Sequence, residues 1–238
     1  MNSTTNDKLA VLIDADNAQA SPIHELLEEV SRYGTASVKR AYGDWSTPQL
    51  KKWKEELHTH AIKPVQQFAY TKGKNSTDSA LIIDAMDLLH TGGLNGFCLV
   101  SSDSDFTPLA ARIREAGLVV YGFGERKTPQ PFVAACDKFI YTDILNPPQA
   151  AAAGKGKSKV PSPKAKLREA VDKAALDDGW AHLGTVGTML LKNDPSFDSR
   201  NYGFRKLVDL VKAQSYLEVR HEKTGGGSGG ATVFVRLR

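Results

Sequence analysis

The sequence lacks the features that mark several large classes of protein. It has only two cysteines, Cys98 and Cys136, among 238 residues, which excludes a disulfide framework and a cysteine-based zinc site. Its apolar runs, such as residues 9–13, are far shorter than the roughly 20 residues that span a bilayer. The polar residues 1–7 lack the basic start and apolar stretch of a secretory signal. We therefore expect a protein of the reducing cytoplasm with no membrane contact.

Charge is distributed unevenly along a chain of otherwise ordinary globular composition. Residues 1–148 contain 15 Lys and Arg against 18 Asp and Glu, a formal charge of −3. The remaining residues contain 16 basic and 9 acidic side chains, a formal charge of +7. This asymmetry predicts two modules with different tasks, and the basic one favours a polyanionic partner such as nucleic acid.

A low-complexity segment at residues 146–163 separates the two modules. Pro, Ala, Gly and Lys dominate it, and it has almost no large apolar residue. Such a composition cannot bury enough surface to offset its ordering entropy, so we expect a flexible basic linker. Its lysines either contact phosphates or only keep the segment soluble. The expected domains are therefore residues 7–145 and 164–238.

The front module alternates apolar strands with helices. Ser21 and Thr47 each precede a proline, an arrangement typical of helix starts, and Gly117 follows a predicted helix end. This alternation predicts an α/β fold with a parallel sheet covered by helices on both faces, as in Rossmann-like proteins. Strands are expected at 9–13, 36–42, 62–68, 97–101, 118–123 and 139–141, and helices after 21, after 47 and at 75–89, 108–116 and 130–136.

The back module has a different pattern. Helices are predicted at 165–176, 185–191 and 202–213, and strands at 217–221 and 232–236 flank a glycine-rich tip. Three helices followed by a β-hairpin indicate a small winged helix.

Acidic residues follow the strands of the front module at separate points in the sequence. Asp14 and Asn17 come after the first strand, and Asp103 and Asp105 after the fourth. Asp78 lies in the first turn of the helix that follows the third strand. Because ligands of open parallel sheets bind at the carboxyl ends of the strands, we expect these side chains to meet at one edge.

Clustered carboxylates repel one another, and a bound cation relieves that repulsion. Oxygen ligands without histidine or cysteine favour Mg²⁺ or Mn²⁺, which predicts phosphodiester or phosphomonoester chemistry. For any single aspartate, capping of a helix or interaction with the helix dipole is an alternative explanation, and it stays open. Asp16 is expected to turn toward solvent, and Asp84 to form a salt bridge.

Stretches of the front module resemble the NYN domain, of the LabA-like group of PIN-like nucleases. The resemblance covers residues 7–145 and implies a Mg²⁺- or Mn²⁺-dependent endoribonuclease whose product carries a 5′ phosphate. Asp14, Asp78, Asp103 and Asp105 match the acidic positions, and Asn17 matches a polar position beside the first. The family often has Gly-Val before the middle aspartate, where this chain has Ser76-Thr77. The matching stretches are 11–17, 74–78, 99–109 and 127–141.

The back module resembles an OST-HTH, or LOTUS, winged-helix domain. Its matching stretches are 167–171, 180–187 and 198–211. The resemblance implies RNA binding, with single- or double-stranded RNA left open, and protein partners such as helicases. We expect Tyr202 and Phe204 to pack in the core. The candidate RNA-binding residues are Arg200, Arg205, Lys206 and Lys212, together with Lys72 and Lys74 before Asp78.

Three functions fit this sequence. The first is a metal-dependent endoribonuclease in which the winged helix recruits RNA. The second is an RNA-binding adaptor whose acidic cluster is inert. The third is a phosphatase of the haloacid-dehalogenase type, because Asp14 and Asp16 resemble its nucleophile and its acid–base residue.

Overall fold

The computed structural model describes residues 6–68, 76–145, 161–223 and 231–238. Two compact units make up the chain, Met1–Pro148 and Gln149–Arg238. Most of the predicted linker, residues 146–160, lies outside the described residues, as do Lys72 and Lys74. Each unit is described by itself.

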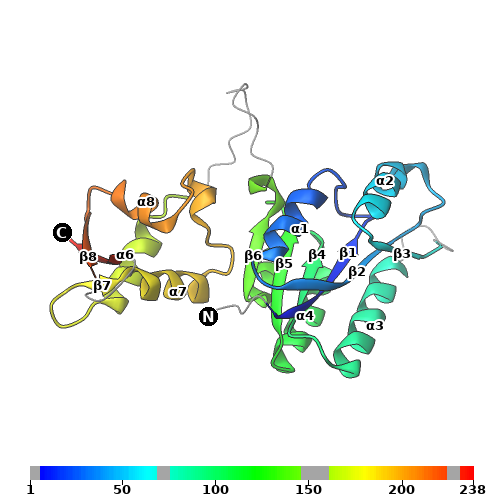
Figure 1. Ribbon diagram of the computed structural model, residues 1–238, viewed down its shortest axis with the longest axis horizontal. Coiled ribbons are helices and arrows are strands. Elements are labelled where there is room, and N and C mark those ends of the chain that lie inside the picture. Colours follow the sequence, from blue (N-terminus) through cyan, green and yellow to red (C-terminus); the bar gives the residue numbers. More distant parts are fainter. Residues whose placement is uncertain (1–5, 69–75, 146–160, 224–230) are drawn as a thin grey trace, which may run out of the picture. The chain divides into compact units, whose positions relative to one another are not determined.

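A six-stranded parallel sheet forms the centre of the N-terminal unit, as predicted (Figure 1). Its strand order is β3-β2-β1-β4-β5-β6, so the order reverses between β1 and β4. At such a switch point two neighbouring loops leave toward opposite faces, and a crevice opens between them. The strands are β1 (Lys8–Asp14), β2 (Thr35–Gly43), β3 (Lys63–Gln66), β4 (Gly96–Val100), β5 (Val119–Gly124) and β6 (Lys138–Tyr141).

Helices cover both faces of this sheet (Figure 1). One face packs against α1 (Ile23–Ser31) and α2 (Lys51–Thr59). The other packs against α3 (Ser76–Thr91), α4 (Thr107–Glu115) and α5 (Gln130–Ala135). Short 3-10 turns, η1 (Pro48–Leu50), η2 (Ser104–Phe106) and η3 (Thr142–Ile144), complete the unit.

The central strand β1 shows how the sequence assigns side chains to the two faces. Leu9, Val11 and Ile13 join the core on the α1 and α2 side, while Ala10 and Leu12 join the core on the other side. Successive side chains of a strand point to opposite faces. Asp14, the next even-numbered residue, therefore turns toward the face that α3 covers.

The C-terminal unit has three α-helices and a small antiparallel sheet in the order β7-β9-β8. Its own core includes Leu167, Val186, Leu210 and Val235. The short strand β7 and the 3-10 turn η4 were not predicted. Its elements are α6 (Lys164–Ala174), β7 (Ala181–His182), α7 (Leu183–Asn193), η4 (Ser199–Tyr202), α8 (Leu207–Lys212), β8 (Leu217–Lys223) and β9 (Ala231–Leu237).

The third predicted helix of this unit, 202–213, begins too early in the sequence-based prediction. Tyr202 ends η4, and Gly203 adopts a φ of 84° that reverses the chain before α8 begins at Leu207. Glycine adopts this left-handed conformation without steric cost. Tyr202 and Phe204 still pack against the core, as expected. Their spacing looks helical because both side chains are directed toward the core, although a turn and not a helix carries them.

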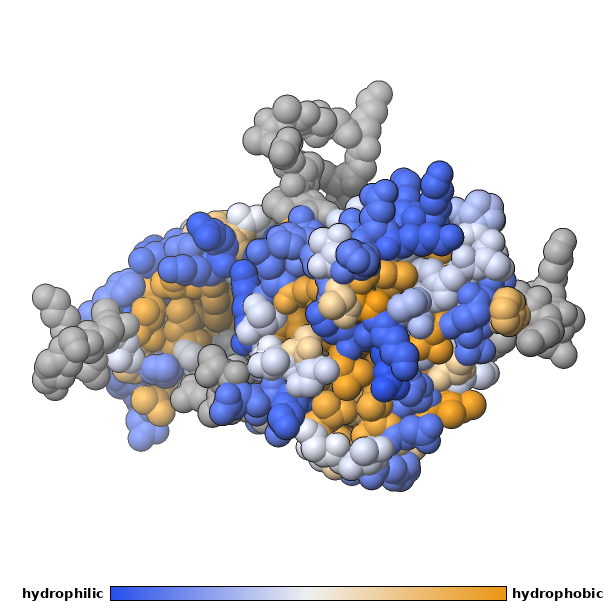
Figure 2. Space-filling view, turned by 45° about the vertical axis from the view of Figure 1, so that its right-hand side comes forward, coloured by the Kyte–Doolittle hydropathy of each residue, from blue (hydrophilic) through white to orange (hydrophobic). Residues whose placement is uncertain are grey.

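Few large hydrophobic side chains are exposed among the described residues. Phe68, Ile83 and Leu176 are 52–63% exposed. On the face drawn in Figure 2, hydrophobic residues lie between hydrophilic ones in both units. In the parts of the chain that the structure describes, no helix is both long and apolar enough to cross a bilayer.

Candidate functional site

Three of the predicted acidic residues meet at the carboxyl edge of the sheet. Asp78 in the first turn of α3, Asp103 before η2 and Asp105 within η2 each place one carboxylate oxygen within 4.8 Å of the others. Asp78 is buried, Asp103 is half-buried and Asp105 is exposed. Oxygen atoms at this spacing, open to solvent on one side, match the ligand set of a hard divalent cation.

Asp14 lies beside this group but is held differently. It is fully buried, and its Oδ2 accepts hydrogen bonds from Asn17 Nδ2 at 2.9 Å and from Ser101 Oγ at 2.8 Å. The backbone N–H of Asn17 donates to Oδ1 at 3.3 Å. Burial raises the pKa of Asp14, and these hydrogen bonds offset part of the rise. Asn17, which was predicted as a site residue, therefore lies next to the acidic group and orients the Asp14 carboxylate.

Ser101 connects Asp14 to the loop that carries the other acids. Its hydroxyl donates to Asp14 and accepts the backbone N–H of Asp103 at 3.1 Å. Asp103 in turn accepts the backbone N–H of Asp105 at 2.9 Å. The cap that was the alternative explanation therefore exists at Asp103, and it also positions Asp105. A serine after a strand has no specific sequence signal, so this bridging position of Ser101 is visible only in the structure.

Asp78 has the strongest electrostatic signature of the cluster. Burial, followed by the negative charges of Asp14, Asp103, Asp105 and Asp16, raises its pKa to about 6. A carboxylate placed among other carboxylates in this way is stabilised by a nearby cation. The oxygen-only donor set and this repulsion fit a site for Mg²⁺ or Mn²⁺.

Asp16 is exposed, as predicted, yet it contacts the site's edge. Its Oδ2 accepts a hydrogen bond from Thr77 Oγ1 at 2.7 Å. The loop after β1 is thereby joined to the first turn of α3, immediately before Asp78. Thr77 stands where the family often has valine, so this departure from the pattern supplies the hydroxyl group that makes the contact.

A second polar contact joins α3 to the sheet farther along the helix. Asp84 accepts hydrogen bonds from the Arg40 guanidinium and the Tyr42 hydroxyl, both on β2. The predicted salt bridge of Asp84 is therefore confirmed. Burial, followed by the interaction with Asp84, raises the pKa of the buried Tyr42 well above its ordinary value, so the phenol stays a donor. The contact sets the position of the helix that carries Asp78.

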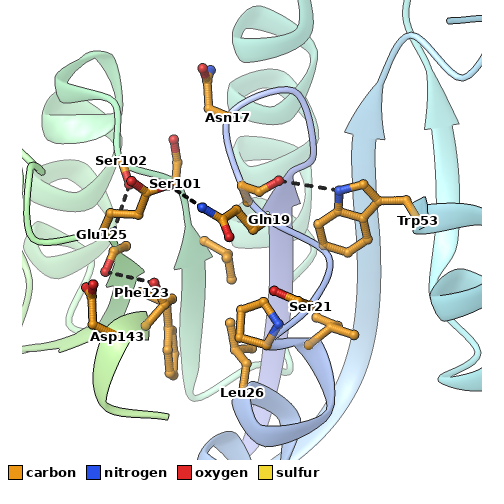
Figure 3. Close-up of a pocket in the computed structure, with 16 residues that line it drawn as sticks. Asn17, Gln19, Ser21, Leu26, Trp53, Ser101, Ser102, Phe123, Glu125 and Asp143 are labelled. Atoms are coloured by element: carbon orange, nitrogen blue, oxygen red, sulfur yellow. Dashed lines mark hydrogen bonds between the residues drawn. The ribbon is translucent and has the colours of Figure 1, made fainter. Parts of the chain in front are cut away.

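A cavity of about 200 Å³ opens on the α1 and α2 side of the same sheet edge (Figure 3). The rim is polar, and Ser102 Oγ accepts the backbone N–H of Glu125 at 2.9 Å. Ser101 belongs to both the cavity wall and the acidic site. The apolar walls include Ile23, Leu26, Trp53, Val100 and Phe123, and the polar rim includes Asn17, Gln19, Ser101, Ser102, Glu125 and Asp143.

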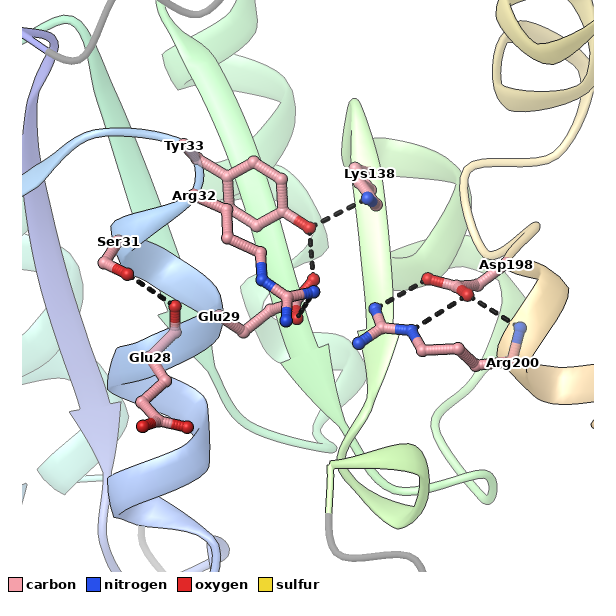
Figure 4. Close-up of polar contacts among 8 residues, drawn as sticks. All are labelled: Glu28, Glu29, Ser31, Arg32, Tyr33, Lys138, Asp198 and Arg200. Carbon is pink, nitrogen blue, oxygen red and sulfur yellow. Dashed lines mark hydrogen bonds and ion pairs between the residues drawn. The ribbon is translucent and has the colours of Figure 1, made fainter. Parts of the chain in front are cut away.

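A separate polar network lies on α1 and β6. The buried Glu29 accepts a hydrogen bond from the Tyr33 hydroxyl at 2.5 Å and pairs with Arg32 at 2.9 Å (Figure 4). Lys138 Nζ donates to the Tyr33 hydroxyl at 2.8 Å. These contacts compensate the buried carboxylate of Glu29, so we assign it a structural role.

The basic residues predicted to bind RNA do not share one helical face. Arg200 lies in η4 and pairs with Asp198 at 2.7 Å, a pair also drawn in Figure 4. Arg205 and Lys206 are exposed before α8 begins, and Lys212 is exposed in its last turn. Gly203 separates η4 from α8, so of these four residues only Lys212 lies within helix α8.

Comparison with protein families assigns both units. The NYN domain matches residues 8–145, which is more than half of the chain. The chain belongs to the NYN family. An OST-HTH/LOTUS domain matches residues 158–228. NYN is a PIN-like nuclease domain and OST-HTH domains bind RNA, so the acidic group lies in a nuclease fold that precedes an RNA-binding domain.

Three solved structures are similar to parts of this NYN-family chain, whereas no curated protein matches it. A Vibrio parahaemolyticus protein of unknown function is 20% identical over 59% of this chain and 96% of its own, with a TM-score of 0.49. An uncharacterised Nitrosomonas europaea protein is 34% identical over 39% of this chain and 88% of its own, with a TM-score of 0.31. A Chromobacterium violaceum protein is 37% identical over 34% of this chain and 85% of its own, with a TM-score of 0.27.

Proposed function

We propose that this protein is a metal-dependent endoribonuclease whose OST-HTH domain recruits the RNA. The observation that carries the proposal is the meeting of Asp78, Asp103 and Asp105 beside the buried Asp14 at the switch point of an NYN-domain sheet. Carboxylates that raise one another's pKa are costly to the fold, and cation binding accounts for their retention in one place.

Asp78, Asp103 and Asp105 would hold the cation. The buried carboxylate of Asp14 would add negative charge next to them. A bound Mg²⁺ or Mn²⁺ supplies a water of lowered pKa and polarises a phosphoryl oxygen. Ser101 and Asn17 keep Asp14 in one orientation, and Asp103 in its cap keeps Asp105 at the rim. The proposed product carries a 5′ phosphate, as the family resemblance implies.

The cavity beside the site would receive a nucleotide adjacent to the cleaved phosphate. Its apolar walls suit the flat face of a base, and its polar rim suits the edge. Glu125 and Asp143 at the rim disfavour a phosphate there and favour a base that donates hydrogen bonds. Continuity with the acidic site through Ser101 supports this assignment.

The C-terminal unit would raise the local concentration of RNA at the site by tethering it. Arg200, Arg205, Lys206 and Lys212, with Lys72 and Lys74, remain our candidates for phosphate contacts. Neutralised phosphates release counterions, so RNA binding should weaken as salt rises. A helicase-type protein partner of this unit is a further expectation from its family.

The two other candidate functions have less support. If the protein were an adaptor without activity, nothing would explain why four carboxylates that repel one another lie together. A phosphatase of the haloacid-dehalogenase type needs an accessible nucleophile, whereas Asp14 is fully buried and both of its oxygens accept hydrogen bonds.

Cleavage of a labelled RNA that contains single- and double-stranded parts tests the proposal. We expect cleavage by the wild type with Mn²⁺ or Mg²⁺, none in EDTA, and a loss of about 100-fold or more in Asp103→Asn. Asp87→Asn, an exposed acid on α3 outside the site, is the matched control and should cleave normally. Bound but uncut RNA under every metal would instead support the adaptor, and phosphate release from small monoesters without RNA cleavage would support the phosphatase.

A further inference from the structure

The outer face of the C-terminal sheet carries a group of flat side chains that the core does not use. Along β9, Val233, Val235 and Leu237 pack inward against the helices, which turns Phe234 and Arg236 outward. Cross-strand pairing aligns Phe234 with His182 of β7 on one side and with Arg220 of β8 on the other. Neither His182 nor Phe234 belongs to the hydrophobic core of the unit.

These side chains stack in a continuous series. The Arg236 guanidinium carbon lies 4.6 Å from the Trp180 ring centroid, and the Arg220 guanidinium carbon lies 4.4 Å from the same centroid. Arg220 also lies 5.5 Å from the Phe234 ring, which meets the His182 ring edge-on at 5.7 Å. The Trp180 ring is buried beneath the two guanidinium groups. We call the four outer residues, His182, Arg220, Phe234 and Arg236, the stacking face.

Carboxylates hold both guanidinium groups in place. Arg220 pairs with Glu222 at 2.7 Å, and Arg236 pairs with Glu218 at 2.7 Å. These pairs balance the formal charge locally, so attraction to phosphates is a small part of what the face can do. What remains is a set of oriented planes, the kind of surface on which nucleic-acid bases stack.

The charge of the surrounding domain indicates which flat ligand would come to this face. Residues 161–238 contain 13 Lys and Arg against 9 Asp and Glu, a formal charge of +4. A basic domain attracts a polyanion, and stacking planes need bases that are not already paired. Both conditions are met by single-stranded RNA, and a duplex meets only the first.

We propose that the stacking face binds unpaired bases and makes the C-terminal unit selective for single-stranded RNA. The inference rests on the RNA partner of the proposed function and adds the strandedness and the surface. It assigns specificity to the sheet and leaves the basic residues around α8 with phosphate contacts alone.

Fluorescence anisotropy of the full chain with labelled single-stranded RNA and with the matching duplex tests this proposal. EDTA in every sample prevents cleavage, so the readout does not depend on nuclease activity. Arg220→Lys keeps the charge but removes the planar guanidinium group, and Arg168→Lys, at an exposed arginine on α6, is its control. His182→Asn keeps an acceptor for the backbone N–H of Gly184 at the start of α7 but removes the ring, and His221→Asn is its control. A thermal melt of each variant checks that it folds.

We expect Arg220→Lys and His182→Asn each to weaken single-strand binding by about tenfold, since stacking on one base has a value of that order. The two controls should bind like the wild type, and the duplex should bind more weakly than the single strand. Single-strand affinity within about twofold of wild type in both folded variants would overturn the proposal. Equal affinity for duplex and single strand would also overturn it. Neither result would bear on cleavage by the acidic site, which the metal-dependent assay measures separately.

Discussion

At the scale of single residues, the acidic site is a place where function and stability oppose each other. Asp78 is buried among like charges, and its raised pKa measures the unfavourable free energy of its ionised form. Ser101 and Asn17 counter part of the same cost at Asp14 by donating hydrogen bonds. A cation would remove the remaining repulsion, so site occupancy and folding stability should be linked.

Asp78→Asn should therefore stabilise the metal-free protein while removing its response to metal. In EDTA at neutral pH, we expect the Tm of the N-terminal unit to rise by about 2–4 °C, because one repelling charge is gone. Added Mn²⁺ should raise the Tm of the wild type but not of the variant. Differential scanning fluorimetry across a Mn²⁺ titration measures both effects, with Asp87→Asn as the control that behaves like wild type. A Mn²⁺-induced shift of wild-type size in Asp78→Asn would contradict the assigned ligand set.

At the scale of elements, helix α3 is positioned by contacts at two points along its length. Thr77 bonds Asp16 at its start, and Asp84 bonds Arg40 and Tyr42 two turns later. The hydrophobic contacts of Leu81, Ala85 and Leu89 set which face of α3 is buried. The polar contacts add a fixed register along the sheet, because hydrogen bonds are directional and apolar packing is not.

Asp84→Ala should then affect both folding and metal binding. Loss of a shared acceptor for Arg40 and Tyr42 should cost about 1–3 kcal/mol in the free energy of unfolding. Because α3 carries Asp78, the apparent affinity for Mn²⁺ should also fall. Urea unfolding and the Mn²⁺ dependence of Tm measure the two effects, and Asp87→Ala on the same helix should change neither. A stability loss with unchanged Mn²⁺ affinity would show that Asp84 does not position the site.

The loop that leads into α1 frames the cavity beside the acids, so a bulky residue there should alter RNA cleavage. We expect Ser21→Phe to slow cleavage by about tenfold and to change the preferred nucleotide next to the cut, because the cavity mouth narrows. The Mn²⁺-induced Tm shift should stay the same, since no acid is touched. Sequencing of the cleavage products gives the preference, and Ser31→Phe, at the far end of α1, is the control. An unchanged product pattern would mean that the cavity does not contact substrate.

At the scale of the whole molecule, the two units have separate hydrophobic cores. The cores on the two faces of the parallel sheet draw only on the N-terminal unit, and the third draws only on the C-terminal unit. Domains with their own cores commonly fold as independent cooperative units. The division matches the change of charge sign along the sequence.

Calorimetry should accordingly resolve two unfolding transitions that respond to different substitutions. Burial alone would raise the pKa of Asp194, but hydrogen bonds from Lys166 and Ser196 outweigh it and lower the pKa below 3.8. The ionised form thus stabilises the C-terminal unit above pH 3.8, and this contribution is lost as pH falls through the lowered pKa.

Asp194→Asn should lower only the C-terminal transition at neutral pH, and the difference from wild type should shrink in acid. Asp78→Asn should move only the N-terminal one. A single transition that both substitutions shift would refute independent folding.

The sequence by itself determined the strand and helix order of the NYN domain and the edge where Asp14, Asp78, Asp103 and Asp105 lie. These features follow from local periodicity and from the rule that parallel strands end at one edge, so no long-range geometry is needed. The sequence did not place the start of α8, because the apolar spacing of Phe204 and Leu207 looks helical although the helix begins only at Leu207.

Only the tertiary structure decided which side chains touch. The bonds of Ser101 to Asp14 and of Thr77 to Asp16 join residues 87 and 61 positions apart, and no local pattern encodes such pairs. The stacking face likewise depends on strands β7, β8 and β9 lying side by side, since His182, Arg220 and Phe234 are distant in sequence. Chemistry of this kind is set by the packing of whole elements, where angles and register fix the distances between side chains.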